Sequence, residues 1–439
     1  MKLEYLYIHG YKNLDSFEVY FDKDVSLLAL AGKNGSGKSN VLEAIARIFS
    51  TVYAYEEMPD FTFDIGYAIH GDLVTITNKS SALVIVKNDK VIPWTKRRSV
   101  LPITLFLYYA GETERFKSIS DKAIDKDFDK SVKNGAAPSY KAISYLSVND
   151  FGLSMLVNRC FNLDVSNTIN NILGIEAISK KCAIHLKRPI WGKRGTADNF
   201  WNAKGYIEEI LNFLKANGAC RITSREAAII TLPDCEYIRD DLLGPEGLFK
   251  SLKILQQAGI LDHIEIDVIK EGVTFDCNEL SEGEKQLANF ISIVSFTRSY
   301  SALFLMDEFD SYLHPSWQRV FAGLVYQQDI AGQIVFTTHS PLTLSQMKNN
   351  NVFLLNNGKI FESGLDPYNR NVSEIMEELM DVPLRPEHIM NMLNNFNKYI
   401  ATKNIAAAKK IRQDLSVLLS ADDPFFITAD LSIARIERQ

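Results

Sequence analysis

The stretch GKNGSGKS, residues 32–39, matches the spacing GxxxxGK[ST] in full. It follows the apolar run VSLLALA and precedes SNVLEAIARIF, in which apolar residues recur at helical spacing. Glycines in such a loop let backbone NH groups converge on phosphate oxygens, and the start of the following helix adds partial positive charge. We therefore expect a strand, a loop and a helix that together bind a nucleoside triphosphate.

The residues of this phosphate loop have separate expected roles. Lys38 is expected to reach the β and γ phosphates, and the Ser39 hydroxyl is expected to ligate magnesium. The expected cofactors are therefore ATP and Mg²⁺. The remaining nucleotide contacts are expected from Gly32, Asn34, Gly35, Ser36, Gly37 and Asn40.

Two carboxylates follow a second apolar run, in ALFLMDEFD. A carboxylate at the end of a buried strand is costly unless it serves a cation, so Asp307 is expected to hold Mg²⁺. Glu308 is expected to orient or activate the attacking water. A third apolar run, QIVFTTHS, places His339 where an imidazole would contact the γ phosphate. The alternatives are a strand that simply reaches solvent and a structural histidine.

The motif LSEGEKQ, residues 280–286, begins a helix that carries its own glycine. Ser281 is expected to be the N-cap, with Glu284 at the capping-box position. A helix start is also an anion site. Ser281, Gly283 and Glu284 are therefore candidates for nucleotide contacts as well as for helix capping.

The order of these motifs resembles the heads of ATP-binding-cassette (ABC) ATPases. That resemblance implies that the serine and glycine of LSEGE close on the γ phosphate bound by another subunit, so that each ATP lies between two chains. YIHGYKNL and DEFDSYLHPSWQ narrow the resemblance to the class of RecF, SMC heads and overcoming-lysogenization-defect (OLD) nucleases. Lys12 and Asn13 match the motif with which this class contacts nucleotide, although an exposed turn is the alternative. His314 and Pro315 match its loop across the dimer interface.

The chain departs from this class at one position. Many relatives sense magnesium with a glutamine between the phosphate loop and LSxGE, but this chain has no glutamine before Gln256. The matching region is YYAGETERF, where Gly111 or Glu112 is expected to occupy the loop.

The expected fold class is α/β, with a P-loop NTPase head of ABC type whose mixed sheet is built from both ends of the chain and flanked by helices. The strand-like runs at residues 1–114 and the strand and helix alternation at 279–372 predict the two lobes of this head. More polar, helical pieces predict a helical insertion at 115–278. Residues 373–439 read as a C-terminal helical region.

Composition excludes several classes of protein. The chain has 439 residues, 46% hydrophobic and 23% charged, which is ordinary for a globular protein. A net charge of -6 argues against a uniformly basic nucleic-acid coat. The most membrane-like window, 287–306, is broken by Arg298, and the start carries no secretory signal, so a cytoplasmic protein that avoids the membrane is expected. Five widely spaced cysteines without a CxxC pair indicate neither disulfides nor zinc.

The chain has no sustained heptads, no Cys/His array and only a short helical stretch after His339. These features argue against the members of this class that carry a long coiled coil or a fused nuclease domain. What remains resembles the Septu (PtuA-type) antiphage ATPases, which also occur with retrons. That resemblance implies ATP-driven homodimers or higher oligomers, and a separate HNH nuclease that docks on the C-terminal helices and is restrained or released by the ATPase. The chain itself is expected to be an ATPase and not a nuclease.

Two alternatives stay open. A RecF-like repair ATPase would bind DNA directly, and DNA or a retron RNA/DNA molecule is a further candidate partner.

The basic cluster HLKRPIWGKR, with Lys187, Arg188, Lys193 and Arg194 around Trp191, would bind a phosphate backbone and stack a base. A solvated loop with one packed tryptophan is the other interpretation.

Overall fold

The computed structural model describes residues 1–54, 58–80, 82–111, 115–122, 143–161, 163–193, 195–240, 244–361, 366–380 and 382–437. The chain forms two units, Met1–Asn369 and Arg370–Gln439, which we call the head unit and the C-terminal unit. The sequence motifs predicted this division after residue 372.

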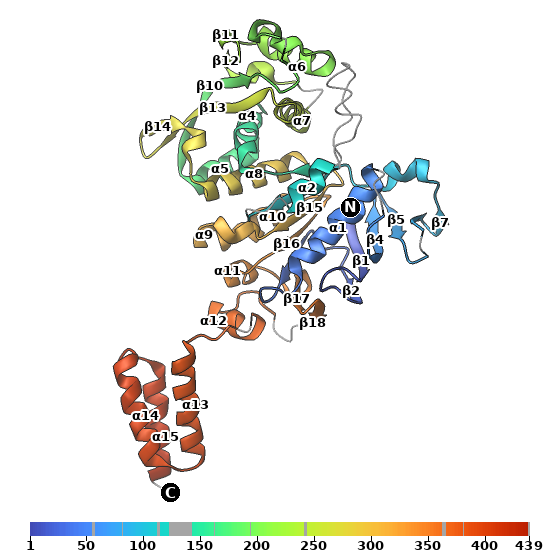
Figure 1. Cartoon of the computed structure of the whole chain (residues 1–439). Coiled ribbons are helices and arrows are strands. Elements are labelled where there is room, and N and C mark those ends of the chain that lie inside the picture. The colour runs from blue at the N-terminus through green and yellow to red at the C-terminus, as the bar shows by residue number, and fades with distance from the viewer. Residues whose placement is uncertain are drawn as a thin grey trace. The chain divides into compact units, whose positions relative to one another are not determined.

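A seven-stranded sheet forms the centre of the head unit (Figure 1). Its strands, in spatial order, are β18 (Lys359–Phe361), β17 (Val352–Asn356), β3 (Leu27–Ala31), β16 (Gln333–Thr337), β15 (Leu303–Asp307), β8 (Leu105–Tyr109) and β9 (Ile143–Tyr145). All neighbours are parallel except β17 and β18, a hairpin that the turn signal NNGK predicted. β3, β15 and β16 are buried along their whole length, as expected for parallel strands covered on both faces.

A six-stranded antiparallel sheet lies beside it. In spatial order its strands are β2 (Phe17–Tyr20), β1 (Lys2–His9), β4 (Thr62–Ile69), β5 (Asp72–Thr77), β6 (Val84–Lys87) and β7 (Lys90–Val91). Side chains alternate between buried and half-buried along β4, so one face of this sheet is turned to the core.

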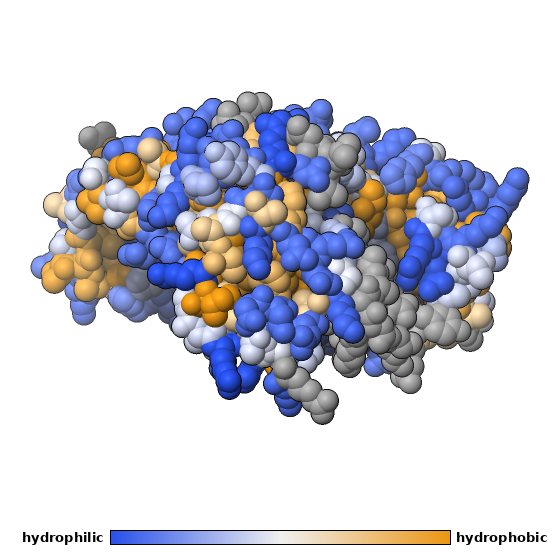
Figure 2. Space-filling view, turned by 90° about the horizontal axis from the view of Figure 1, so that it is seen from above, coloured by the Kyte–Doolittle hydropathy of each residue, from blue (hydrophilic) through white to orange (hydrophobic). Residues whose placement is uncertain are grey.

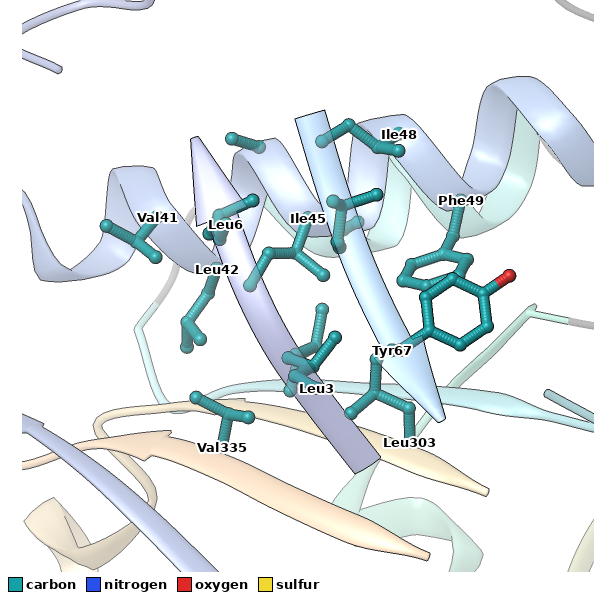
Figure 3. Packing of buried hydrophobic residues seen from close by; sticks show 14 of the residues in the cluster. Leu3, Leu6, Val41, Leu42, Ile45, Ile48, Phe49, Tyr67, Leu303 and Val335 are labelled. Atoms are coloured by element: carbon teal, nitrogen blue, oxygen red, sulfur yellow. The ribbon is translucent and has the colours of Figure 1, made fainter. Parts of the chain in front are cut away.

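Helix α1 (Lys38–Ala54) packs between the two sheets. Figure 3 shows Val41, Ile45 and Phe49 of this helix among side chains of β1 and β4 and, below them, Leu303 and Val335 of the central sheet. Apolar residues therefore cover α1 on nearly every side, which is the pattern of a core helix. This packing fixes the helix that follows the phosphate loop.

Residues 115–278, between the two lobes, were predicted to form a helical insertion, but the region is not purely helical. It contains a five-stranded antiparallel sheet in the order β11 (Ala219–Ser224), β12 (Ala227–Leu232), β10 (Ile175–Lys187), β13 (Leu261–Lys270) and β14 (Val273–Asp276). The prediction failed because this sheet buries one face only, so polar residues interrupt its apolar ones, as in LDHIEIDVIK. Residues 143–145 also belong to the head, as strand β9 of its central sheet.

The other elements of the head unit are short helices around these sheets. The α-helices are α2 (Arg115–Lys122), α4 (Phe151–Phe161), α5 (Asp164–Leu173), α6 (Gly205–Ala216), α7 (Gly244–Gln257), α8 (Glu282–Phe296), α9 (Pro315–Gln318), α10 (Phe321–Tyr326) and α11 (Pro341–Leu344). The 3₁₀ turns are η1 (Trp94–Val100), η2 (Val148–Asp150), η3 (Ala197–Asn202), η4 (Cys235–Ile238), η5 (Cys277–Glu279), η6 (Phe309–Tyr312) and η7 (Asn349–Asn351).

The C-terminal unit is helical, as predicted. It consists of α12 (Val372–Glu374), the π-helical turn η8 (Ile375–Leu379), α13 (Glu387–Ala401), α14 (Ile405–Leu418) and α15 (Pro424–Glu437). Phe396, Ala408, Ala429 and Ile433 form one buried cluster, and Ile389, Leu415 and Phe426 form another. The three long helices thus share a core of their own.

Figure 2 shows hydrophilic residues over much of the face seen from above, with hydrophobic residues in separate groups. Among the residues that the structure describes, no helix is both long and apolar enough to cross a bilayer. All five cysteines are free thiols, and all but Cys220 are buried.

Candidate functional site

Three of the predicted site motifs follow adjacent central strands of the seven-stranded sheet. The phosphate loop follows β3, Glu308 follows β15, and His339 follows β16 by two residues. Because these three strands are parallel and adjacent, their carboxyl ends lie together. The strand order therefore brings into one place three motifs that are far apart in the sequence.

Close backbone packing shapes the phosphate loop. Gly32 has φ 141°, and a Cβ at this position would lie 2.2 Å from the carbonyl oxygen of Leu355 in β17. Any side chain would push the loop away from the sheet, so only glycine fits. Asn13 supports the loop from outside, because its Nδ2 donates to the Gly35 carbonyl at 3.0 Å and its Oδ1 accepts from Asn40 Nδ2 at 2.7 Å.

Lys38 lies inside the curve of the loop. Its Nζ donates to the carbonyl oxygens of Gly32 at 2.8 Å and Lys33 at 3.0 Å. Burial lowers the pKa of Lys38 to about 8, although the negative charges of Asp307 and Glu308 oppose this shift. The ammonium is thus held among backbone carbonyls with its charge poorly solvated, a setting that favours an incoming anion.

Asp307 is fully buried at the end of β15. Its Oδ1 accepts hydrogen bonds from Ser39 Oγ at 2.9 Å and Thr337 Oγ1 at 2.6 Å. Its Oδ2 has no hydrogen-bond partner, and burial raises the pKa of this carboxyl group. A carboxylate with an unused oxygen beside a serine hydroxyl is a donor set that suits Mg²⁺, which typically takes one or two protein ligands and completes its shell with water and phosphate oxygens.

Glu308 and His339 flank this carboxylate. Glu308 has φ 55°, a left-handed conformation uncommon outside glycine, and its backbone NH donates to Thr337 Oγ1 at 2.8 Å. Burial and the positive charge of Lys38 lower the pKa of His339, while the charge of Glu308 opposes this. His339 is therefore close enough to both charges to respond to them, and its imidazole is favoured in the neutral form.

Two polar side chains that the sequence analysis missed organise this edge. Thr337 bonds to both the Asp307 side chain and the Glu308 backbone, so it orients the Asp307 carboxylate and holds the backbone of Glu308. Asp310 is buried and accepts hydrogen bonds from Thr338 and, at 2.7 Å, from Thr343, which ties the end of β15 to the chain after β16. The run FTTHS contained Thr337 and Thr338, but only the pairing of β15 with β16 shows what they hold.

Lys12 is directed at a carboxylate of α1. Its Nζ pairs with Glu43 Oε2 at 2.6 Å, and Glu43 is nearly buried. The loop that carries Lys12 therefore lies against both the phosphate loop, through Asn13, and the helix that follows it. Nucleotide contacts by Lys12 and Asn13 stay a prediction.

The motif LSEGE forms the predicted helix cap. Ser281 is the N-cap of α8, and its side chain and that of Glu284 form a capping box. Glu284 also pairs with Lys270 Nζ at 2.6 Å. A Cβ on Gly283 would lie 2.5 Å from the carbonyl oxygen of Tyr312, so this glycine lets α8 begin directly against the loop after the acidic pair. Contacts of Ser281, Gly283 and Glu284 with nucleotide stay a prediction.

Arg115 occupies the region where the sequence offered no glutamine. Gly111 follows β8, and Glu112 lies outside the described residues. Arg115, the first residue of α2, places its Nε 3.2 Å from Glu43 Oε2 and its Nη1 3.8 Å from Asp307 Oδ2. The sequence signal was a basic residue shortly after an apolar strand, which is too common to identify a site.

The basic cluster around Trp191 resembles a packed surface loop. Lys187 pairs with Asp262 at 2.6 Å, and Arg188 pairs with Glu226 at 2.9 Å. The indole NH of Trp191 donates to the Ala258 carbonyl at 2.9 Å. Arg194 lies outside the described residues. These pairings favour the interpretation of a loop with one packed tryptophan over that of a nucleic-acid clamp.

The chain is similar to one family model and to several bacterial proteins over different parts of its length. Residues 166–345 match the family model described as "AAA domain, putative AbiEii toxin, Type IV TA system". A retron Ec83 probable ATPase of Escherichia coli is 26% identical over 43% of this chain, and the match covers 36% of that protein's own length. A retron Vc95 probable ATPase of Vibrio cholerae is 21% identical over 91% of this chain and 84% of its own. The Septu protein PtuA of Bacillus thuringiensis is 21% identical over 99% of this chain and 98% of its own.

A solved SMC head domain from Thermotoga maritima aligns with 83% of this chain and all of its own, at 14% identity and a TM-score of 0.38. This TM-score is too low to support an argument. The fold class of the chain therefore rests on the strand order and the phosphate loop described above.

The lowered pKa of Lys38 predicts a pH dependence of nucleotide binding. Above pH 8 the free protein loses the ammonium that ATP needs, so the affinity for ATP is expected to fall roughly ten-fold per pH unit. The dissociation constant of a fluorescent ATP analogue between pH 7 and 9.5 measures this slope.

Lys33 supplies the matched control, because it is the exposed lysine of the same loop. Lys33→Ala is expected to keep the wild-type slope. An affinity that stays constant over this pH range in the wild type would show that Lys38 does not control binding.

Proposed function

We propose that this chain, a P-loop ATPase of the ABC type related to Septu PtuA and to retron ATPases, joins a second copy of itself on ATP. Through that change it controls a partner nuclease in defence against phages. The observation that carries the proposal is the meeting of Lys38, Ser39, Asp307, Glu308 and His339 at one sheet edge.

The chemistry is positioning and charge stabilisation. Backbone NH groups of the phosphate loop and Lys38 hold the β and γ phosphates. Ser39 and Asp307 would hold Mg²⁺, which would neutralise charge on the phosphate oxygens. Glu308 orients the attacking water from a backbone conformation that Thr337 fixes. His339, whose imidazole is favoured in the neutral form, donates a hydrogen bond to the γ phosphate. This contact forms only when the γ phosphate is present.

The exposed start of α8 supports a site shared between two chains. Ser281 is exposed at the N-terminus of a helix, where backbone NH groups attract anions. Gly283 packs against Tyr312, and Tyr312 and the neighbouring His314 are exposed as well. Ser281, Tyr312 and His314 therefore lie on one exposed surface around the buried Gly283, and in this proposal that surface meets the γ phosphate held by the other copy.

The C-terminal unit supports docking of the nuclease. Val417 on α14 and Ile427 and Leu431 on α15 are 84%, 67% and 67% exposed. Ile427 and Leu431 are four residues apart and therefore lie on one face of α15. In this proposal the HNH subunit covers that face, while the head unit binds the nucleotide.

Replacing Glu308 tests its role in hydrolysis. Glu308→Gln is expected to slow ATP turnover by about 10²- to 10⁴-fold with ATP affinity unchanged, because the amide cannot activate water. The steady-state rate and the affinity for a fluorescent analogue are measured on the same preparation.

Glu271 offers a matched control, since it is exposed and shares the left-handed backbone with φ 53°. Glu271→Gln is expected to turn over ATP at the wild-type rate. Normal turnover by Glu308→Gln would remove Glu308 from the mechanism.

Ser281 tests the shared site. Ser281→Arg is expected to abolish ATP-dependent association, because a long cation obstructs the surface that meets the second copy. Molar mass is measured by light scattering with ATP in a Glu308→Gln background, where hydrolysis is slow. Ser281→Ala removes only the cap and is expected to associate. Dimers of Ser281→Arg in that background, together with full ATP hydrolysis by the Ser281→Arg single variant, would exclude a shared site.

The partner is tested by capture from the native cells with a tagged chain, followed by mass spectrometry before and after digestion of DNA. An HNH protein is expected in both samples, and the double variant Ile427→Asp, Leu431→Asp is expected to lose it. Asn394→Asp places a negative charge at an exposed residue of a different helix, α13, and is expected to keep it. Recovery of recombination proteins alone, lost on digestion, would favour a RecF-like DNA-binding ATPase instead.

A further inference from the structure

The Arg115 guanidinium lies between two carboxylates that come from different elements. Nε is 3.2 Å from Glu43 of α1, and Nη1 is 3.8 Å from Asp307 of β15. The Glu43 and Asp307 side chains are 9% and 0% exposed, and that of Arg115 is 30% exposed. A planar guanidinium can serve two acceptors at once, which a lysine ammonium on a flexible stem does less well.

The two carboxylates depend on Arg115 to different degrees. Glu43 also pairs with Lys12 at 2.6 Å and with Arg47 at 3.9 Å, so its charge stays compensated without Arg115. Within the described part of the chain, Asp307 forms its one ion pair with Arg115, and Oδ2 has no hydrogen bond. The interaction with Arg115 therefore matters most to Asp307.

Arg115 and a divalent cation require the same oxygen. Ser39 and Thr337 already occupy Oδ1 of Asp307, so Oδ2 is the lone acceptor through which a further positive charge can be bound. A cation there would weaken the attraction of Asp307 for Arg115, since two positive charges at one carboxylate repel each other.

We propose that Arg115 is a positioning residue that competes with Mg²⁺ for Asp307, so that Mg²⁺–ATP releases Arg115 and with it the start of α2. This inference rests on the proposed ATPase function. Arg115 is the first residue of α2, which follows β8 of the central sheet. Binding of Mg²⁺–ATP thereby changes the contacts of the helix that follows β8, and Arg115 takes the part that a sensor glutamine would have.

The proposal predicts how strongly Mg²⁺ favours nucleotide binding. The dissociation constant of a fluorescent ATP analogue is measured in EDTA and in excess Mg²⁺. The constant in EDTA divided by the constant in Mg²⁺ gives the factor by which Mg²⁺ strengthens binding. Arg115→Ala removes the competitor of Mg²⁺ at Asp307, so this ratio is expected to rise roughly five-fold, the size of a moderate ion pair. Arg115→Lys keeps the charge but not the planar fork, and an intermediate ratio is expected.

A second readout follows α2 itself. In the wild type, addition of the Mg²⁺–ATP analogue is expected to change hydrogen exchange of residues 115–122, as observed by mass spectrometry. In Arg115→Ala the exchange of α2 is expected to be the same with and without nucleotide, because the connection to Asp307 is already absent.

Arg47 provides the matched control, because it pairs with Glu43 and with Asp60 at 3.4 Å but forms no ion pair with Asp307 in the described structure. Arg47→Ala is expected to keep the wild-type ratio. An unchanged or lower ratio in Arg115→Ala would overturn the proposal. If Arg115→Ala does not fold, the ratio in Arg115→Lys decides in the same way. Failure of the wild type to bind the analogue at all would instead overturn the proposed ATPase site.

Discussion

The burial of Asp307 is the constraint on which the rest of the site depends. A charged carboxylate without water costs several kcal/mol unless hydrogen bonds and positive charge compensate it. Here the compensation comes from Ser39 after the phosphate loop, Thr337 on β16 and Arg115 on α2. Each contact joins another element to the end of β15, so one carboxylate holds together the parts of the head that handle phosphate. Its unpartnered oxygen is what makes the same arrangement useful for a cation.

The head unit brings distant parts of the chain into one sheet, and buried polar side chains hold that arrangement. The Gln333 side chain accepts from the Leu3 backbone at 2.8 Å and donates to the Val25 carbonyl at 3.0 Å. Gln333 is fully buried, so its amide must find these partners or lose the free energy of solvation. One side chain of β16 thus joins the antiparallel sheet, through β1, to the central sheet that carries the phosphate loop.

A single motif can serve capping and recognition together. The Ser281 and Glu284 side chains each accept a hydrogen bond from the other residue's backbone NH, while Lys270 compensates the charge of Glu284. These contacts hold the start of the helix in place, and Gly283 allows the loop with Tyr312 to pack against it. A rigid, exposed helix start with an adjacent loop suits the proposed contact with a second copy, since little conformational freedom remains to be lost on binding.

Local sequence by itself determined the phosphate loop, the acidic pair after an apolar strand, the cap of α8 and the helices of the C-terminal unit, because each depends on the spacing of neighbouring residues. Only the tertiary structure decided what depends on distant pairing. Thr337 and Arg115 gained roles because β16 and α2 lie beside Asp307, and the one-sided sheet of the inserted region was hidden by its polar face. The burial that raises the pKa of Asp307 likewise exists only once the strands around it are assembled.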